Sequence, residues 1–220
     1  IDNDPYKSAG VDISAGNDLI DMIKGDVASS HGPNVLGNIG GFAGMFRLDK
    51  EYENPILVAC TDGVGTKVAL AQDNRKIDGI GQDLVAMCVN DLIVCGARPL
   101  FFLDYFASSK LSLNEVVNFV KGVSKACANS GVILAGGETA EMPDVYKDEH
   151  CDLVGTIVGS LDKTQIIDGK NDIKAGNIVL GLKSNVLERM FLYWVRVSCF
   201  KYIEHKNNKL EASVGFFELE

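Results

Sequence analysis

The chain has few basic residues, and this shortage sets the first limit on its function. Lysine and arginine total 21 against 30 aspartate and glutamate residues, which gives a formal net charge of −9 at pH 7. Surfaces that bind nucleic acid are normally basic, so the composition argues against a DNA or RNA partner. No apolar run reaches the roughly 18 residues of a membrane-spanning helix. The sequence therefore predicts neither a nucleic-acid partner nor a membrane partner.

The common signatures of metal and disulfide sites are also missing. The three histidines are far apart, and none of the six cysteines forms a C-x-x-C pair. Most of the cysteines lie inside apolar segments, which is typical of free, buried thiols in a reducing compartment. We therefore expect a cytoplasmic protein.

Glycine is plentiful although proline is scarce. The chain has 23 glycines and 5 prolines, and this pattern indicates backbone that must approach another group closely. Only Gly215 lies after residue 182, whereas the last 38 residues hold seven of the 17 aromatic residues. This shift marks a boundary near residue 182. The explanations are the start of a domain, a truncation or a tail of different origin.

Hydrophobic periodicity predicts interleaved helices and strands. Helices are expected at residues 15–24, 80–95 and 113–129, and strands at 56–60, 100–106, 132–135, 153–161 and 178–180. Residues 31–47 are glycine-rich and are expected to form a loop. The pattern is that of a mixed α/β or α+β protein.

A possible phosphate-binding segment follows the first predicted strand. It is Thr61-Asp62-Gly63-Val64-Gly65-Thr66-Lys67. The two glycines allow backbone N–H groups to turn toward an anion, and the lysine adds a positive charge. A carboxylate at the end of a strand can hold Mg²⁺. The alternative is an ordinary Asp-Gly turn, and the spacing is not that of a P-loop.

Two further acidic positions accompany predicted elements. Asp91 falls on the apolar face of the helix at 80–95, where a carboxylate needs a partner, a metal or a helix end. Glu138 and Glu141 follow the glycines of Gly136-Gly137-Glu138-Thr139-Ala140-Glu141, and one helical turn would place both on one face. The alternatives are a salt-bridged or capped acid for Asp91 and a helix N-terminus for the glutamates.

These segments together suggest how an acidic chain could bind a polyanion. Mg²⁺ held by carboxylates would neutralise phosphates that the scarce basic residues cannot. The segment 37–44, which includes Gly40 and Gly41, could then cover a triphosphate. The alternative is a surface loop.

Several segments resemble the phosphoribosylformylglycinamidine cyclo-ligases, also called aminoimidazole ribonucleotide synthetases. The resembling segments occur in the family's order and spacing across about residues 6–182. They are YKSAGVDI (6–13), AGN (15–17), GGF (40–42), TDGVGTK (61–67), DLVAMCVND (83–91), PLFFLDY (99–105) and GGETAEMP (136–143). Related ATP-using kinases and synthetases have a segment similar to D-G-V-G-T. They are not similar through the F-F-L-D-Y run or the E-T-A-E-M-P run.

The resemblance implies an α+β N-terminal domain over residues 1–170, with a four-stranded sheet and helices packed on one face, and two such sheets paired in a homodimer. Residues 171–220 would then be the truncated start of a second α/β domain with an atypical tail. It implies ATP-dependent closure of formylglycinamidine ribonucleotide to aminoimidazole ribonucleotide, with ADP and phosphate as the other products.

The resemblance also implies which residues of this chain bind Mg²⁺ and ATP. The metal candidates are Asp62, Asp91, Glu138 and Glu141, with Asp91 also the candidate catalytic residue. The ATP candidates are Lys24, Gly40, Gly41, Asp62, Gly63, Gly65, Thr66, Lys67, Gly137 and Glu138. Lys24 has the alternative of a solvated lysine at a helix end.

The resemblance stops after residue 185. The family continues with a Gly-x-His-[Ser/Thr]-Asn-Gly-Tyr segment, whereas this chain has Val186-Leu187-Glu188-Arg189 and no such motif after it. Ala43 also replaces a glycine that is frequent in the family. The alternative function is therefore a catalytically inactive nucleotide-binding or dimerisation module of the same family.

Overall fold

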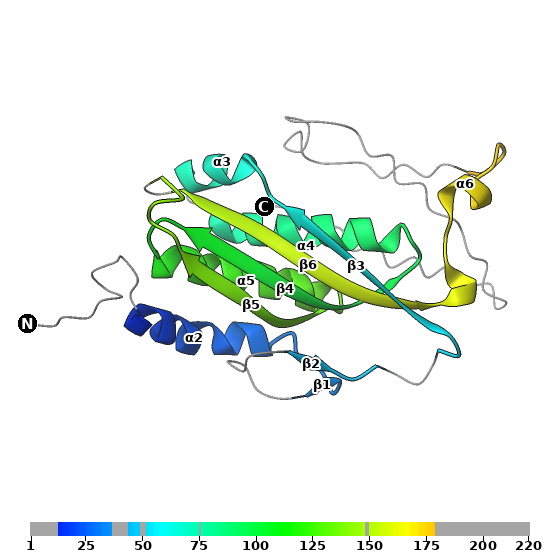
Figure 1. The fold of residues 1–220 in the computed structure, drawn as a ribbon, viewed down its shortest axis with the longest axis horizontal. Helices are drawn as coiled ribbons and strands as arrows, with labels where there is room; N and C mark the ends of the chain where they lie inside the picture. Colours follow the sequence, from blue (N-terminus) through cyan, green and yellow to red (C-terminus); the bar gives the residue numbers. More distant parts are fainter. Residues whose placement is uncertain (1–12, 37–43, 49–51, 75, 148–149, 179–220) are drawn as a thin grey trace, which may run out of the picture.

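The core of the protein is a four-stranded sheet of mixed direction (Figure 1). A computed structural model of the chain describes residues 13–36, 44–48, 52–74, 76–147 and 150–178. The sheet strands are β3 (Pro55–Gly63), β4 (Arg98–Ser108), β5 (Ile133–Glu141) and β6 (Cys151–Asp162), in the order β3-β6-β4-β5. β6 is antiparallel to both neighbours, and β4 and β5 are parallel.

The predicted fold class is confirmed, because helices α4 and α5 pack behind this sheet in Figure 1. Helix α5 (Leu113–Asn129) is the crossover that a parallel β4–β5 pair requires. Its bounds match the prediction, and Gly131, with φ at +64°, follows its end. Helix α4 (Ile77–Ile93) lies between β3 and β4 in the chain. None of the helices in the described residues is long and apolar enough to cross a membrane.

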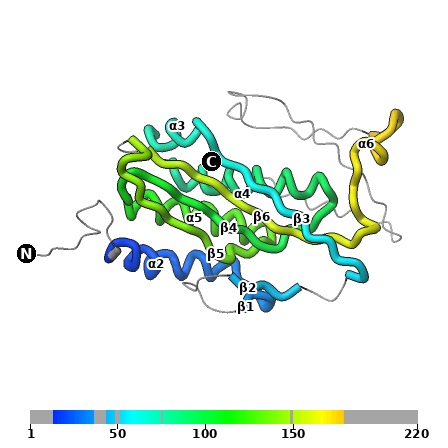
Figure 2. Tube along the Cα trace, viewed as in Figure 1, coloured from blue at the N-terminus to red at the C-terminus, as the bar shows by residue number. Residues whose placement is uncertain are grey.

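Helix α2 (Ile13–Ala28) is tied to the edge strand β5 by two side chains. The backbone N–H of Leu134 donates to the Ser30 hydroxyl at 2.9 Å, and Nε2 of His31 donates to the Leu134 carbonyl at 2.9 Å. Both backbone groups of Leu134 on the outer edge are therefore satisfied without a further strand. In the tube view α2 runs along the β5 side of the sheet (Figure 2).

Several predicted bounds need correction. The glycine-rich segment 31–47 holds a small antiparallel pair, β1 (Val35–Leu36) and β2 (Met45–Phe46), at its described ends. A short helix, α3 (Lys67–Asp73), was not predicted. The 3₁₀ turn η1 (Lys163–Gln165) and helix α6 (Gly169–Asp172) follow β6. Ile178 is not in a strand, and residues 179–220, with the rest of the second predicted domain, lie outside the described residues.

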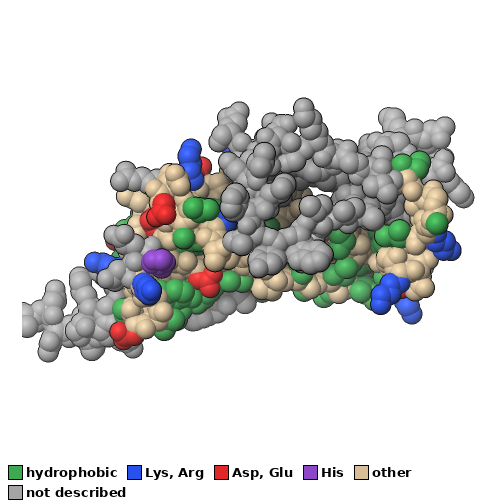
Figure 3. Space-filling view, turned by 90° about the horizontal axis from the view of Figure 1, so that it is seen from above, with side chains coloured by type: hydrophobic (Ala, Val, Ile, Leu, Met, Phe, Trp, Pro, Cys, Tyr) green, Lys and Arg blue, Asp and Glu red, His purple; other side chains and the backbone are tan. Residues whose placement is uncertain are grey.

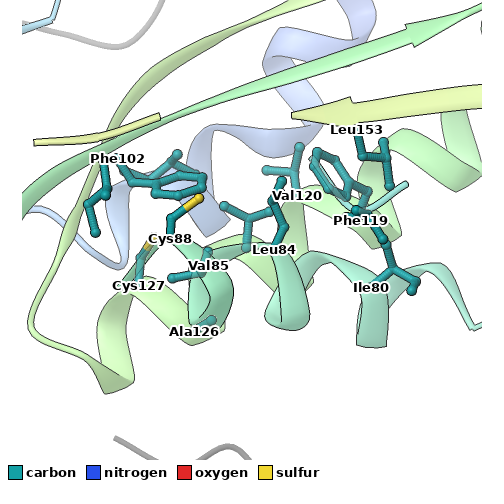
Figure 4. Close-up of a cluster of buried hydrophobic side chains, with 14 of the residues drawn as sticks. Ile80, Leu84, Val85, Cys88, Phe102, Phe119, Val120, Ala126, Cys127 and Leu153 are labelled. Atoms are coloured by element: carbon teal, nitrogen blue, oxygen red, sulfur yellow. The ribbon is translucent and has the colours of Figure 1, made fainter. Parts of the chain in front are cut away.

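Alternate residues of the strands face the two helices. On β6, Leu153, Ile157 and Leu161 are buried, and Gly155 and Gly159 lie between them. A Cβ atom at Gly155 would strike the Phe102 ring, and one at Gly159 would strike Leu92. Figure 4 shows the resulting core, in which Leu84, Cys88 and Val120 of the helices meet Phe102 and Leu153 of the sheet. The glycines thus allow α4 to lie directly against the central strand.

The two core helices also approach each other at glycines. A Cβ atom at Gly122 of α5 would overlap the backbone carbonyl of Asp78 on α4, and one at Gly81 would meet the carbonyl of Phe119. Backbone atoms cannot swing aside as a flexible side chain can, so the whole helix pair would have to separate.

We expect Gly122→Ala to lower the free energy of unfolding by about 2 kcal/mol or more, because overpacking of a core contact typically costs roughly 1–3 kcal/mol. Urea denaturation measures the change. Gly25→Ala on the exposed side of α2, where a Cβ would meet nothing within 4 Å, is the matched control. It should leave stability unchanged or raise it by up to about 1 kcal/mol. Equal stability of the two variants would contradict the close packing.

One carboxyl group lies on the helix-facing side of the sheet. Asp104 falls between the buried Phe102 and Phe106 on β4. Its Oδ1 lies against Gly137 on β5, where the Cβ atom of any other residue would collide with it. The residue is not fully enclosed, but its carboxyl is surrounded by protein atoms, and desolvation raises its pKa from 3.8 to about 7. The Asp104 backbone N–H partly opposes this shift.

A raised pKa of a carboxyl makes the folded protein hold a proton that the unfolded chain releases. Stability should therefore fall as the pH rises from about 4 to about 7, by up to about 1.4 kcal/mol per pH unit, and stay level above that range. Asp104→Asn, which is neutral at every pH, should be more stable than the parent at pH 8 and lose this advantage at pH 4. Thermal unfolding against pH measures it, with Asp144→Asn as the exposed control. A parent that gains stability between pH 4 and 7 would contradict the assignment.

Candidate functional site

The D-G-V-G-T-K segment lies at one end of the sheet, where β3 leads into α3. Asp62 and Gly63 are the last two residues of β3, paired with Gly155 and Val154 of β6. The strand therefore extends to Gly63, beyond the predicted end at residue 60. The alternative, an ordinary Asp-Gly turn after the strand, is also wrong. Oδ1 of Asp62 accepts from the backbone N–H of Gly63 at 2.8 Å. The side chain is thereby oriented on the helix-facing side of the sheet, and the residue is partly exposed.

The turn itself comes two residues later. Gly65 has φ at +69°, a conformation that disfavours any residue with a side chain, and a Cβ there would meet nothing within 4 Å. Thr66 precedes α3 without a capping bond from its side chain. The backbone of this turn therefore needs a glycine at position 65, and no atom lies against the place of a side chain there.

Lys67 forms an ion pair that the sequence did not predict. Its Nζ donates to Oδ2 of Asp83 on α4. Asp83 is buried, with 5% of its side chain exposed, whereas Lys67 keeps 30%. The pair joins α3 to α4 and stabilises the charge of a carboxylate that burial alone would disfavour. The ammonium group lies beside the turn, but part of its charge is already balanced.

The charges of Asp91 and Asp62 both act on the thiol of Cys60. Burial raises the pKa of the Cys60 thiol, and the charges of Asp91 and then Asp62 raise it further. Burial likewise raises the pKa of Cys88 to about 12, with smaller contributions from Cys60 and both aspartates. The Cys60 thiol donates to the Cys88 carbonyl at 3.4 Å. Both thiols are therefore protonated at neutral pH and are poor nucleophiles.

The acidic pair of Asp62 and Asp91 fits a divalent cation. Both side chains are partly exposed, and Mg²⁺ is typically held by one or two carboxylates together with water and phosphate oxygens of a substrate. Asp91 lies on the side of α4 that faces β3, as its place in the apolar pattern predicted. A bound cation would relieve the repulsion between the two like charges.

The two glutamates lie elsewhere. Glu138 and Glu141 are in strand β5, not in a helical turn, so the prediction that they share a face is wrong. Residues three apart in a strand point to opposite faces. Oε1 of Glu141 accepts from the backbone N–H of Leu111 at 2.7 Å, which ties β5 to the loop before α5. Glu138 is exposed, and its Oε1 accepts from the backbone N–H of Thr139.

The strand order separates the glutamates from the aspartate pair. Asp62 lies level with Gly155, Asp104 and Gly137 across the sheet, so three strand spacings of about 4.8 Å, roughly 14 Å in all, separate β3 from β5. Among the described residues, no group of three or more histidine, cysteine, aspartate or glutamate side chains is placed to hold a metal ion. The four predicted metal ligands therefore do not surround one ion within a single chain.

Other candidate residues lie apart from the Asp62 turn. Lys24 is exposed on α2 and pairs with Asp21 at 2.6 Å, the arrangement expected of a solvated helix lysine. Gly137 belongs to β5 and lies beneath Asp104. Gly40 and Gly41 lie outside the described residues.

Sequence reasoning overlooked Asp83 and Cys60. Asp83 is eight residues before Asp91 on the same helix and lies within the resembling D-L-V-A-M-C-V-N-D segment. A charged residue in the middle of an apolar helix pattern was the available signal, because such a residue requires a partner of opposite charge. Cys60 gave no signal beyond its place two residues before Asp62.

The five cysteines among the described residues are free thiols, as predicted. Cys88 and Cys127 are fully buried, and Cys60, Cys95 and Cys151 are partly buried. Burial raises the pKa of the Cys151 thiol to about 12 as well. Cysteine thus serves as a small core side chain here.

Comparison with solved structures supports the fold. Thiamine-monophosphate kinase from Stenotrophomonas maltophilia K279a is similar, with a TM-score of 0.53 and 20% identity over 66% of this chain and 43% of the kinase. Hydrogenase maturation protein HypE, in its complex with ATP, has a TM-score of 0.51 and 21% identity over 70% of this chain and 42% of HypE. The chain therefore spans less than half the length of these proteins.

Residues 40–161 match the family described as AIR synthase related protein, N-terminal domain. The match covers more than half of the chain and contains β3 to β5 and nearly all of β6, together with the Asp62 turn and Asp91. The chain belongs to the AIR synthase related family and carries its N-terminal domain.

Proposed function

We propose that this domain binds ATP together with Mg²⁺. The observation that carries the proposal is the Asp62–Asp91 pair beside the open turn at Gly65. Two neighbouring carboxylates in a chain of net charge −9 repel a polyphosphate unless a cation lies between them. Membership of the AIR synthase related family and the likeness to a HypE structure that contains ATP support the same ligand.

Within this proposal each residue has a limited task. Asp62 and Asp91 would hold the cation that bridges the phosphates, and backbone N–H groups around Gly65 would donate to phosphate oxygens. Lys67, paired with Asp83, would supply a fixed positive charge beside them. The side chain of Asp62 is already oriented by its bond to Gly63, so little rotamer freedom is lost when the ligand binds.

For the protein that contains this domain, we propose ATP-dependent ring closure of formylglycinamidine ribonucleotide. The γ-phosphoryl group is transferred to the formyl amide oxygen, the amidine nitrogen attacks the activated carbon, and phosphate leaves as the imidazole forms. The products are aminoimidazole ribonucleotide, ADP and phosphate. Positioning and charge neutralisation are the main contributions of an enzyme to such a transfer. Free thiols at the described cysteines fit a cytoplasmic location.

The F-F-L-D-Y run favours the cyclo-ligase over the related kinases. It is residues 101–105, which form the centre of β4, and it places Asp104 beside Gly137 of the G-G-E-T-A-E segment on β5. Two segments of the resemblance are therefore in direct contact. The alternative, an inactive module, is favoured by the missing histidine motif after residue 185. ATP binding without conversion of formylglycinamidine ribonucleotide would support the inactive module.

We propose that two copies pair through the face of the sheet that α4 and α5 leave open. Leu57 on β3 is 59% exposed and Leu103 on β4 is 36% exposed, and both point away from the two helices. A second sheet on this face would bury them. Sedimentation of the intact chain measures the association, and a monomer at every concentration would contradict it.

Asp62→Asn should weaken MgATP binding at least tenfold, because the neutral amide is a much poorer ligand for Mg²⁺ than a carboxylate. Isothermal titration calorimetry of the intact chain measures the affinity. Asp26→Asn on α2 makes the same change of charge far from the turn and should leave affinity unchanged. Equal ATP binding by the parent with and without a chelator would contradict the metal's role.

Asp91→Ala should reduce MgATP affinity by a similar factor with little loss of melting temperature. The side chain is partly exposed, so its removal does not leave a fully enclosed cavity in the core. A large fall in melting temperature with normal ATP affinity would instead show that Asp91 has a structural role.

A further inference from the structure

We draw no further inference here: the strongest candidate, the exposed isoleucines of the chain after β6 (Ile166, Ile173 and Ile178), toward the end of the molecule where Lys and Arg side chains gather in Figure 3, carries nothing because the structure does not show what covers them.

Discussion

The close approach of α4 to the central strand β6 determines where the functional side chains lie. It depends on Gly155 and Gly159 of β6, since a side chain at the first would collide with Phe102 and one at the second with Leu92. The same register places Asp62 and Asp104 on either side of Gly155, both on the helix-facing side. One carboxyl thus lies at the open edge of the sheet and the other beneath its centre. Their different surroundings follow from strand order alone, because β3 is an edge strand and β4 is not.

Burial decides which of these acids can act on a ligand. The carboxyl of Asp104 is surrounded by protein atoms, and desolvation raises its pKa to about 7. Asp62 and Asp91 instead stay partly open and act together on the Cys60 thiol, raising its pKa. A pair of like charges at an open edge is unfavourable unless a cation is present. Lys67 cannot fully supply that charge, because it is already paired with Asp83. In the proposed function the cation therefore comes with the nucleotide.

Much of the fold was predictable because its elements have clear periods and stops. Helix α5 has a strong apolar stripe and a Ser-Gly stop, and its bounds were predicted to the residue. The error at Glu138 and Glu141 arose because Gly-Gly-Glu-Thr-Ala-Glu has no apolar period of its own. Pairing with β4 makes that segment a strand, and pairing is a long-range interaction that local sequence does not encode. The ion pair of Lys67 with Asp83 was missed for the same reason, since its partners lie 16 residues apart on different helices.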